Sequence, residues 1–414
     1  MIWLLAAPAR RAGIFIFALS LAVRVALVLL MHTDRELERT ELINTAVSVS
    51  EGRGFANAYG ADSGPTAHFA PLYPLLLSAV FRIAGSGPKA ALAQQVIGYS
   101  VASAAYALLP AVAQVLELST GVGISAGIAA ALLPVNFWAE RGTYPSVWAA
   151  LFIALLLIYS GRVWRERRFN IKSALLGGLL AGIVMLTDPV VLTFMAALVA
   201  AGFAALRCSR LAYWCVLLVT PCVLLAPWVV RNSLVLGAPV WTRSNLGLEL
   251  SISNSDGSAA TVEENAQPGG IYSRRHPYSN LAELRRVSAM GEVAYNKDRM
   301  REFRLWIASH PGQFARLTSH RFLRFWFPVM LRPVQTIVSW FITLLGLLGL
   351  VEWLRGKPAM SALPLLLFLV YPLPYYIIQT SSRYRFPLEP IVLLFACSFV
   401  LSVIRPIHTA RWTA

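Results

Sequence analysis

Two glutamates near the N-terminus stand where a membrane enzyme could place a general base. Glu38 and Glu41 lie in the polar segment 35–48, just after the first long apolar run. Read as a helix, this segment puts Glu38, Glu41, Thr45 and Ser48 on one polar stripe, with apolar side chains on the opposite face. A carboxylate there can take a proton from an attacking hydroxyl. A solvated helix face without chemistry would have the same pattern.

Arginines that could bind phosphate stand at the ends of apolar runs. Arg231 ends one run and Arg243 follows it, whereas Arg383 and Arg385 flank Tyr384 just before the last run. Guanidinium groups bind phosphate oxygens in a fork and stabilise charge that grows on a leaving oxygen. The alternative for each arginine is snorkelling towards lipid head groups.

Three further polar residues border apolar segments, where ionisable groups are costly and therefore functional candidates. His68 lies in a loop rich in glycine and proline and could bind phosphate or a metal, or hydrogen-bond the backbone. Glu140 could orient a ligand or pair with its neighbour Arg141, and Asp188 interrupts an apolar stretch. No Cys/His spacing is diagnostic of a metal site, so no cofactor is predicted and a divalent metal stays open.

The composition indicates a membrane protein. The chain has 414 residues, of which 57% are hydrophobic and only 14% charged, and its mean hydropathy is +0.61. About a quarter of the residues are charged in an ordinary soluble domain, so the apolar excess here must face lipid. The net charge of +16 is attributed to Lys and Arg in cytoplasmic loops, and no nucleic-acid partner is expected.

The expected fold is an all-α polytopic membrane protein with about ten transmembrane helices and one large periplasmic loop. Residues 1–230 form an N-terminal bundle with a first outer loop at 32–85, residues 231–333 the periplasmic loop, and residues 334–414 the C-terminal helices and a cytoplasmic tail. The expected spans are 13–31, 90–116, 121–138, 144–161, 173–187, 189–206, 211–230, 334–353, 359–378 and 386–404.

The segment 69–85 decides how the later loops are oriented. It is apolar but short, with Pro71 and Pro74 near its start. A crossing there would turn the basic loop 162–172 outward, against the positive-inside rule. We therefore expect a juxtamembrane helix. Under this topology, all the candidate site residues above lie at the outer face of the membrane.

Several segments together resemble a known family. The stretches EGRGFANAYG and GPTAHFAPLYPLLL resemble the first outer loop of bacterial GT-C glycosyltransferases, the relatives of protein O-mannosyltransferases and of the lipid A aminoarabinose transferase. WAERGTYPSVW resembles their second outer loop, and MLTDPVVL, APWVVRNSLVLGAPVWTRSNLGLEL and RYRFPLEP resemble later segments. The resemblance covers residues 15–400 and rests on the order and spacing of these motifs.

The resemblance implies an inverting transferase in the plasma or bacterial inner membrane. Its donor would be a sugar on a polyprenyl phosphate, and its acceptor a lipid, glycan or protein. The family's first-loop catalytic acid falls on Glu38 or Glu41, with Glu41 slightly favoured, although the family's Asp-Glu pair is missing. Glu140 corresponds to the second-loop acid, which would orient the sugar or the acceptor.

Two other functions compete with the transferase. A transporter or flippase of lipid-linked sugars predicts internal repeats and helices broken at mid-membrane, and the sequence has no visible repeat. A non-catalytic assembly partner with the same fold would be marked by loss of the acids, which are present here.

Overall fold

The protein is an all-helical, multi-pass membrane protein. The structure, a computed structural model, describes residues 7–206 and 210–410. Within these residues the chain forms helices and no strand, apart from isolated bridges between Ala56 and Pro65 and between Thr261 and Thr380. The end of the expected cytoplasmic tail, 411–414, lies outside the described residues.

Seven helices of the described part are long and apolar enough to cross a membrane, and each coincides with an expected span. They are Ala9–Met31, Pro88–Val115, Ser146–Glu166, Pro189–Leu206, Leu211–Leu236, Pro333–Arg355 and Ser382–Ile404. Four shorter apolar helices are Leu72–Ala84, Thr120–Leu132, Ile171–Thr187 and Ala362–Ile377. The helix expected over 121–138 ends early because Pro134 disfavours a helical conformation in the residue before it.

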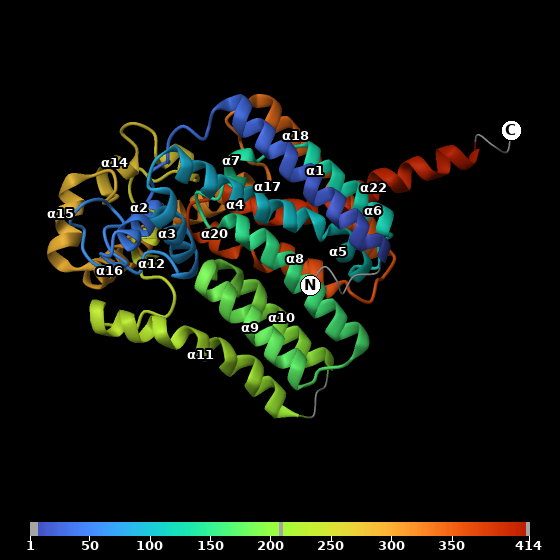
Figure 1. The fold of residues 1–414 in the computed structure, drawn as a ribbon, viewed down its shortest axis with the longest axis horizontal. Coiled ribbons are helices and arrows are strands. Elements are labelled where there is room, and N and C mark those ends of the chain that lie inside the picture. Colours follow the sequence, from blue (N-terminus) through green and yellow to red (C-terminus); the bar gives the residue numbers. More distant parts are fainter. Residues whose placement is uncertain (1–6, 207–209, 411–414) are drawn as a thin grey trace.

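The helices separate into a long bundle and a group of short helices at one end of it (Figure 1). The bundle contains α1 (Ala7–Met31), α4 (Pro88–Ala107), α5 (Leu109–Val115), α6 (Thr120–Leu132), α8 (Ser146–Glu166), α9 (Ile171–Thr187), α10 (Leu192–Leu206), α11 (Leu211–Leu236), α18 (Pro333–Arg355), α19 (Ala362–Val370), α20 (Leu373–Ile377) and α22 (Glu389–Ala410).

The remaining elements belong to the connections between the bundle helices. They are α2 (Glu41–Ser50), α3 (Leu72–Ala84), α7 (Phe137–Glu140), η2 (Pro189–Val191), α12 (Leu246–Ser253), α13 (Val262–Asn265), α14 (Ile271–Arg275), α15 (Leu281–Met290), α16 (Glu292–Ser309), α17 (Pro311–Trp326), α21 (Ser382–Arg385) and η3 (Phe386–Leu388). Pro311 separates two helices, because α16 ends at Ser309 and α17 begins at Pro311.

Small residues let the bundle helices approach closely. A Cβ atom at Gly346 of α18 would lie 2.6 Å from the carbonyl oxygen of Val392 in α22. One turn later, a Cβ atom at Gly349 would fall on the carbonyl oxygen of Phe395. Glycines at such contacts bring two backbones together, which is a common way for helices to pack within a membrane.

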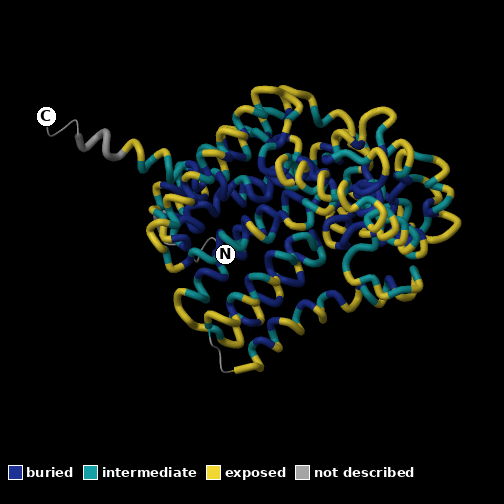
Figure 2. The backbone as a smooth tube through the Cα atoms, turned by 180° about the vertical axis from the view of Figure 1, so that it is seen from behind, coloured by how far each residue is buried: buried dark blue, intermediate teal, exposed yellow. Residues whose placement is uncertain are grey.

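Contacts between distant segments define the two ends of the bundle. At one end, Arg165 Nη2 donates to the carbonyl oxygen of Gln114 at 2.9 Å, and Trp353 Nε1 donates to that of Leu116 at 2.9 Å. At the other end, the Thr33 side chain bonds to the Gln95 side chain. The long loop between α11 and α18 also contacts the first loop, between α1 and α4, at this end. Figure 2 shows buried stretches running through the middle of the bundle and exposed turns at the edges of the loop region.

Helix α3 stays at the end that carries the short helices. The Tyr73 hydroxyl in its first turn donates to the carbonyl oxygen of Gly142. Beyond its last turn, α4 begins at Pro88, and Gln94 in α4 donates to the carbonyl oxygen of Arg141 at 3.1 Å. The first turn of α3 therefore lies beside the connection between α6 and α8, and the following helix α4 contacts the same connection.

Candidate functional site

A large cavity separates the short helices from the end of the bundle. Its volume is about 1080 Å³, and it is lined by segments from the first loop, the long loop and the chain just before α22. The lining includes six of the residues predicted from the sequence, which are Glu41, His68, Asp188, Arg243, Arg383 and Tyr384. Residues separated by more than three hundred positions thus share one site.

Glu41 enters the cavity as the first residue of α2. The helix begins there because the Thr40 side chain caps it by accepting a hydrogen bond from the Ile43 amide at 3.3 Å. The Glu41 side chain is 14% exposed. Burial raises the pKa of this carboxyl, whereas the positive charges of Arg383 and Arg243 oppose that rise. A carboxylate with a raised pKa at the edge of a cavity suits proton transfer.

The predicted polar stripe of segment 35–48 is wrong. Glu38 precedes the helix instead of belonging to it, is half exposed, and pairs with Arg141 Nη1 at 3.2 Å outside the cavity. Thr45 and Ser48 are buried, and the Thr45 hydroxyl donates to the Glu41 carbonyl oxygen at 2.7 Å. The prediction failed because α2 packs against its neighbours with its small hydroxyl residues as well as its apolar ones.

Two arginines of the cavity have no acidic partner. The Arg383 guanidinium carbon lies 3.8 Å from the ring centroid of Tyr144, and its Nη2 donates to the Tyr384 hydroxyl at 3.0 Å. Arg243 Nε donates to the carbonyl oxygen of His68 at 3.0 Å, and its guanidinium lies over Phe69. Within the described residues, neither arginine forms an ion pair, and Arg383 Nε is buried without any hydrogen-bond partner. Both retain hydrogen-bonding capacity for an anion.

The other two predicted arginines do not line this cavity. Arg231 donates to the carbonyl oxygens of Thr66 at 2.9 Å and Phe55 at 2.8 Å, so it holds the first loop in place. Arg385 donates to Glu389 at 2.6 Å and to Ser339 at 3.1 Å, and its side chain is buried. Both guanidinium groups are occupied by contacts within the protein.

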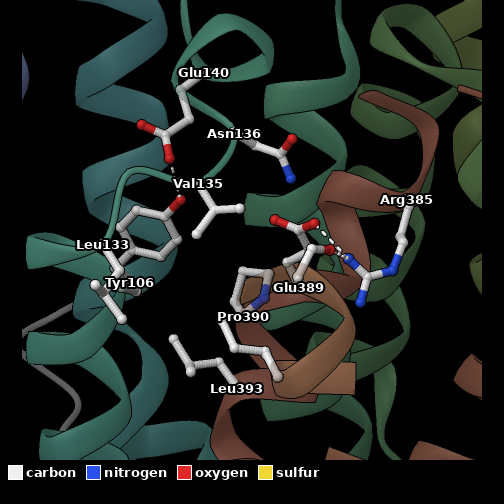
Figure 3. A pocket seen from close by; sticks show the side chains of 12 residues that line it. Tyr106, Leu133, Val135, Asn136, Glu140, Arg385, Glu389, Pro390 and Leu393 are labelled. Atoms are coloured by element: carbon white, nitrogen blue, oxygen red, sulfur yellow. Dashed lines mark hydrogen bonds and ion pairs between the residues drawn. The ribbon is translucent and has the colours of Figure 1, made fainter. Parts of the chain in front are cut away.

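Glu140 lies in a separate, small cavity of about 40 Å³ (Figure 3). Its oxygens accept from Arg24 Nε at 2.7 Å and Nη2 at 3.0 Å, and from the Tyr106 hydroxyl at 2.7 Å. Its partner is therefore Arg24 in α1 rather than the neighbouring Arg141. Glu140 does not line the large cavity.

His68 is held by a tyrosine at the cavity wall. Its Nδ1 lies 2.9 Å from the Tyr59 hydroxyl, and Arg243 occupies its carbonyl oxygen. Burial and the nearby positive charge of Arg243 hold the pKa of His68 well below its usual range. The ring is therefore neutral at physiological pH and can exchange hydrogen bonds with a ligand without carrying charge.

The lining also contains polar residues that were not predicted from the sequence, among them Tyr144, Glu249, Tyr272 and His276. Tyr272 and His276 lie in and directly after α14, in the long loop. Nothing in their spacing connects them to the first loop.

The described residues contain no group of three or more His, Cys, Asp or Glu side chains that could hold a metal ion. Among known proteins, no family model, no curated protein and no solved structure matches the chain.

Proposed function

We propose that the protein is a membrane glycosyltransferase of the GT-C type, which transfers a sugar from a polyprenyl-phosphate donor to an acceptor hydroxyl. The observation that carries this proposal is the grouping of Glu41 with Arg243 and Arg383 in one cavity, where neither arginine forms an ion pair with any residue that the structure describes. Guanidinium groups that form no direct ion pair can bind an anionic ligand. A carboxylate beside them adds a group that can accept a proton.

The apolar part of the cavity suits the lipid portion of such a donor. It consists of side chains from η2, α10, α16, α17 and α20, namely Val190, Leu192, Ile307, Phe314, Leu373, Ile377 and Ile378. Leu373 and Ile377 are 48% and 43% exposed, respectively. An isoprenoid chain could therefore extend from the cavity into the bilayer, while its phosphate stays with the arginines.

The proposed reaction is a single displacement with inversion at the sugar. Glu41 takes the proton from the acceptor hydroxyl, and the acceptor oxygen forms a bond to the anomeric carbon. The bond between this carbon and the phosphate oxygen breaks, and its electron pair stays on the phosphate. Arg243 and Arg383 would stabilise the charge that develops on this leaving oxygen. His68, Asp188 and Tyr384 would position the sugar or the acceptor.

The proposed topology has ten crossings, with the cavity at the periplasmic or outer face. Three crossings would use the short helices α6, α9 and α19–α20, in addition to the seven long ones. The basic turn between α8 and α9, with Arg165, Arg167 and Lys172, would lie in the cytoplasm, as the positive-inside rule requires. The long loop between α11 and α18 would then be periplasmic.

The experiment is a transfer assay on the full-length protein in nanodiscs, with polyprenyl-phosphate sugars as donors and extracted envelope glycolipids as acceptors. We expect Glu41→Gln to lower the rate roughly 10²- to 10⁴-fold, because it removes the base. Glu38→Gln is the matched control, since Glu38 is half exposed and outside the cavity, and should retain the rate. Full activity of Glu41→Gln would disprove the base assignment.

A liposome assay separates the transferase from a flippase. The same lipid-linked sugar is placed in the inner leaflet, and both its translocation and its transfer product are measured. Translocation without product formation would favour the transporter and end the transferase proposal.

A further inference from the structure

His276 has a defined tautomer because of a backbone contact. The Tyr278 amide lies 3.1 Å from His276 Nδ1, and a backbone N–H can only donate. Nδ1 must therefore accept, so in the neutral ring the proton resides on Nε2. The side chain is buried, and loss of solvation lowers the pKa of His276 to about 4. At physiological pH the ring is neutral, with Nε2–H as its only donor.

That donor lies close to Glu41. His276 Nε2 lies 3.6 Å from Glu41 Oε1, slightly beyond hydrogen-bond distance, so a small side-chain rotation would form the bond. Hydrogen bonds at catalytic groups are often long before substrate binds and tighten in the complex. Because the charged form of a carboxylate accepts better than the protonated form, such a bond favours ionised Glu41.

Aromatic side chains hold the imidazole in this position. The Tyr272 ring lies 4.8 Å from the His276 ring, centroid to centroid, at an interplanar angle of 30°. Tyr59 approaches it edge-on at 6.1 Å. The Tyr272 hydroxyl accepts a hydrogen bond from Gln379 Nε2 at 2.6 Å, so the segment before α21 holds the Tyr272 ring against His276.

A second contact fixes the long loop to the start of α2. The Tyr278 hydroxyl donates to the carbonyl oxygen of Arg39 at 2.9 Å, two residues before Glu41. The same tyrosine thus sets the tautomer of His276 through its amide and ties the loop to the Glu41 segment through its hydroxyl. This contact holds the backbone segments that carry the histidine and the glutamate next to each other.

We propose that His276 is a positioning residue for Glu41, donating a hydrogen bond from Nε2–H to the carboxylate and aiming its free oxygen into the cavity. The part that concerns catalysis rests on the proposed function, whereas the contact itself does not. The other charged or titratable groups that act on Glu41 are Arg243, Arg383, Tyr59, Tyr144, Tyr272 and Tyr278. The interactions of these groups with Glu41 are not expected to depend on the tautomer of His276.

The test is nitrogen NMR of the full-length protein in nanodiscs, labelled with ¹⁵N only at histidine. The chain has 6 histidines, and the His276 signals are identified by their loss in His276→Gln. We expect an unprotonated Nδ1 and a protonated Nε2, and we expect Glu41→Gln to move the Nε2 signal. Glu38→Gln is the matched control and should leave it in place. A protonated Nδ1, or an Nε2 signal that stays unchanged in Glu41→Gln, would overturn the proposal.

Two further variants keep the result interpretable. Glu41→Asp retains the charge but shortens the side chain, so it should move the Nε2 signal even if Glu41→Gln does not fold. Where transfer activity is measured, His276→Ala should lower the rate roughly 10- to 100-fold, as expected for one hydrogen bond to a charged group, and His276→Gln should recover part of it through its amide donor. The NMR result needs no substrate, so failure of the transferase proposal would leave it unaffected.

Discussion

The ion pair between Arg24 and Glu140 should be one of the most sensitive points of the bundle. Arg24 is completely buried, and Glu140 is 2% exposed. Besides its two bonds to Glu140, Arg24 donates to the carbonyl oxygens of Ala130 at 2.8 Å and Ala131 at the end of α6. This one side chain therefore links α1, α6 and the start of the connection to α8.

The variant Arg24→Met removes the cation but keeps most of the side-chain volume. Glu140 is then left with the Tyr106 hydroxyl as its only donor, and two carbonyl oxygens lose their partner. Breaking one partner out of a buried ion pair typically costs about 3–5 kcal/mol. Since 1.4 kcal/mol is a factor of ten, the ratio of unfolded to folded protein should rise roughly 10²- to 10⁴-fold.

The double variant Arg24→Met/Glu140→Leu separates pairing from packing. Replacing both charges by apolar groups of similar size is often nearly neutral, because no uncompensated charge remains. We therefore expect the double variant to be more stable than Arg24→Met alone when unfolding is followed in detergent by heat or denaturant. If Arg24→Met alone is as stable as the wild type, or the double variant is less stable than the single one, the reasoning is refuted.

Three further predictions concern other parts of the molecule. Gly98→Ala should destabilise the protein by about 1–3 kcal/mol, because its Cβ atom would lie 2.5 Å from the backbone of Arg141 and Gly142, whereas Gly312→Ala, with open space around it, should not. Glu292→Ala should increase hydrogen exchange in the loop between α1 and α4 and in the long loop between α11 and α18. Its buried carboxylate accepts from the Ala67 amide at 2.7 Å and from two hydroxyls that connect these loops, so unchanged exchange would contradict this role. Acidification from pH 6.5 towards pH 4 should destabilise the folded state, because the pKa of His276 is about 4 in the folded protein and near 6.5 in the unfolded chain. In this pH range the unfolded chain binds the proton and the folded protein does not. Unfolding curves of His276→Gln should therefore show a smaller loss of stability over the same range.

The sequence by itself determined the class of fold. In lipid, every backbone polar group must be bonded within the chain, so long apolar segments can only be helices, and composition alone locates them. The spans expected at 13–31, 211–230 and 334–353 accordingly coincide with α1, α11 and α18. The break at Pro311 was equally local, since proline has no amide hydrogen to donate within a helix.

The sequence also identified many of the polar residues that line the cavity, although it could not sort them. Charged groups beside apolar segments are rare enough to be noticed, and Glu41, Arg243 and Arg383 were found in this way. Arg231 and Arg385 have the same local signature, yet their guanidinium groups are bonded within the protein. A residue's neighbours along the chain do not reveal whether its hydrogen bonds are already satisfied.

Only the tertiary structure decided which charges pair and which stay available. Glu140 is adjacent to Arg141 in the sequence but bonds to Arg24, and Arg141 bonds to Glu38 instead. The approach of His276 to Glu41 likewise depends on the long loop folding back onto the first. Such pairs form at distances of about 3 Å, which are set by how whole helices and loops pack, whereas the sequence specifies only the local direction of each side chain.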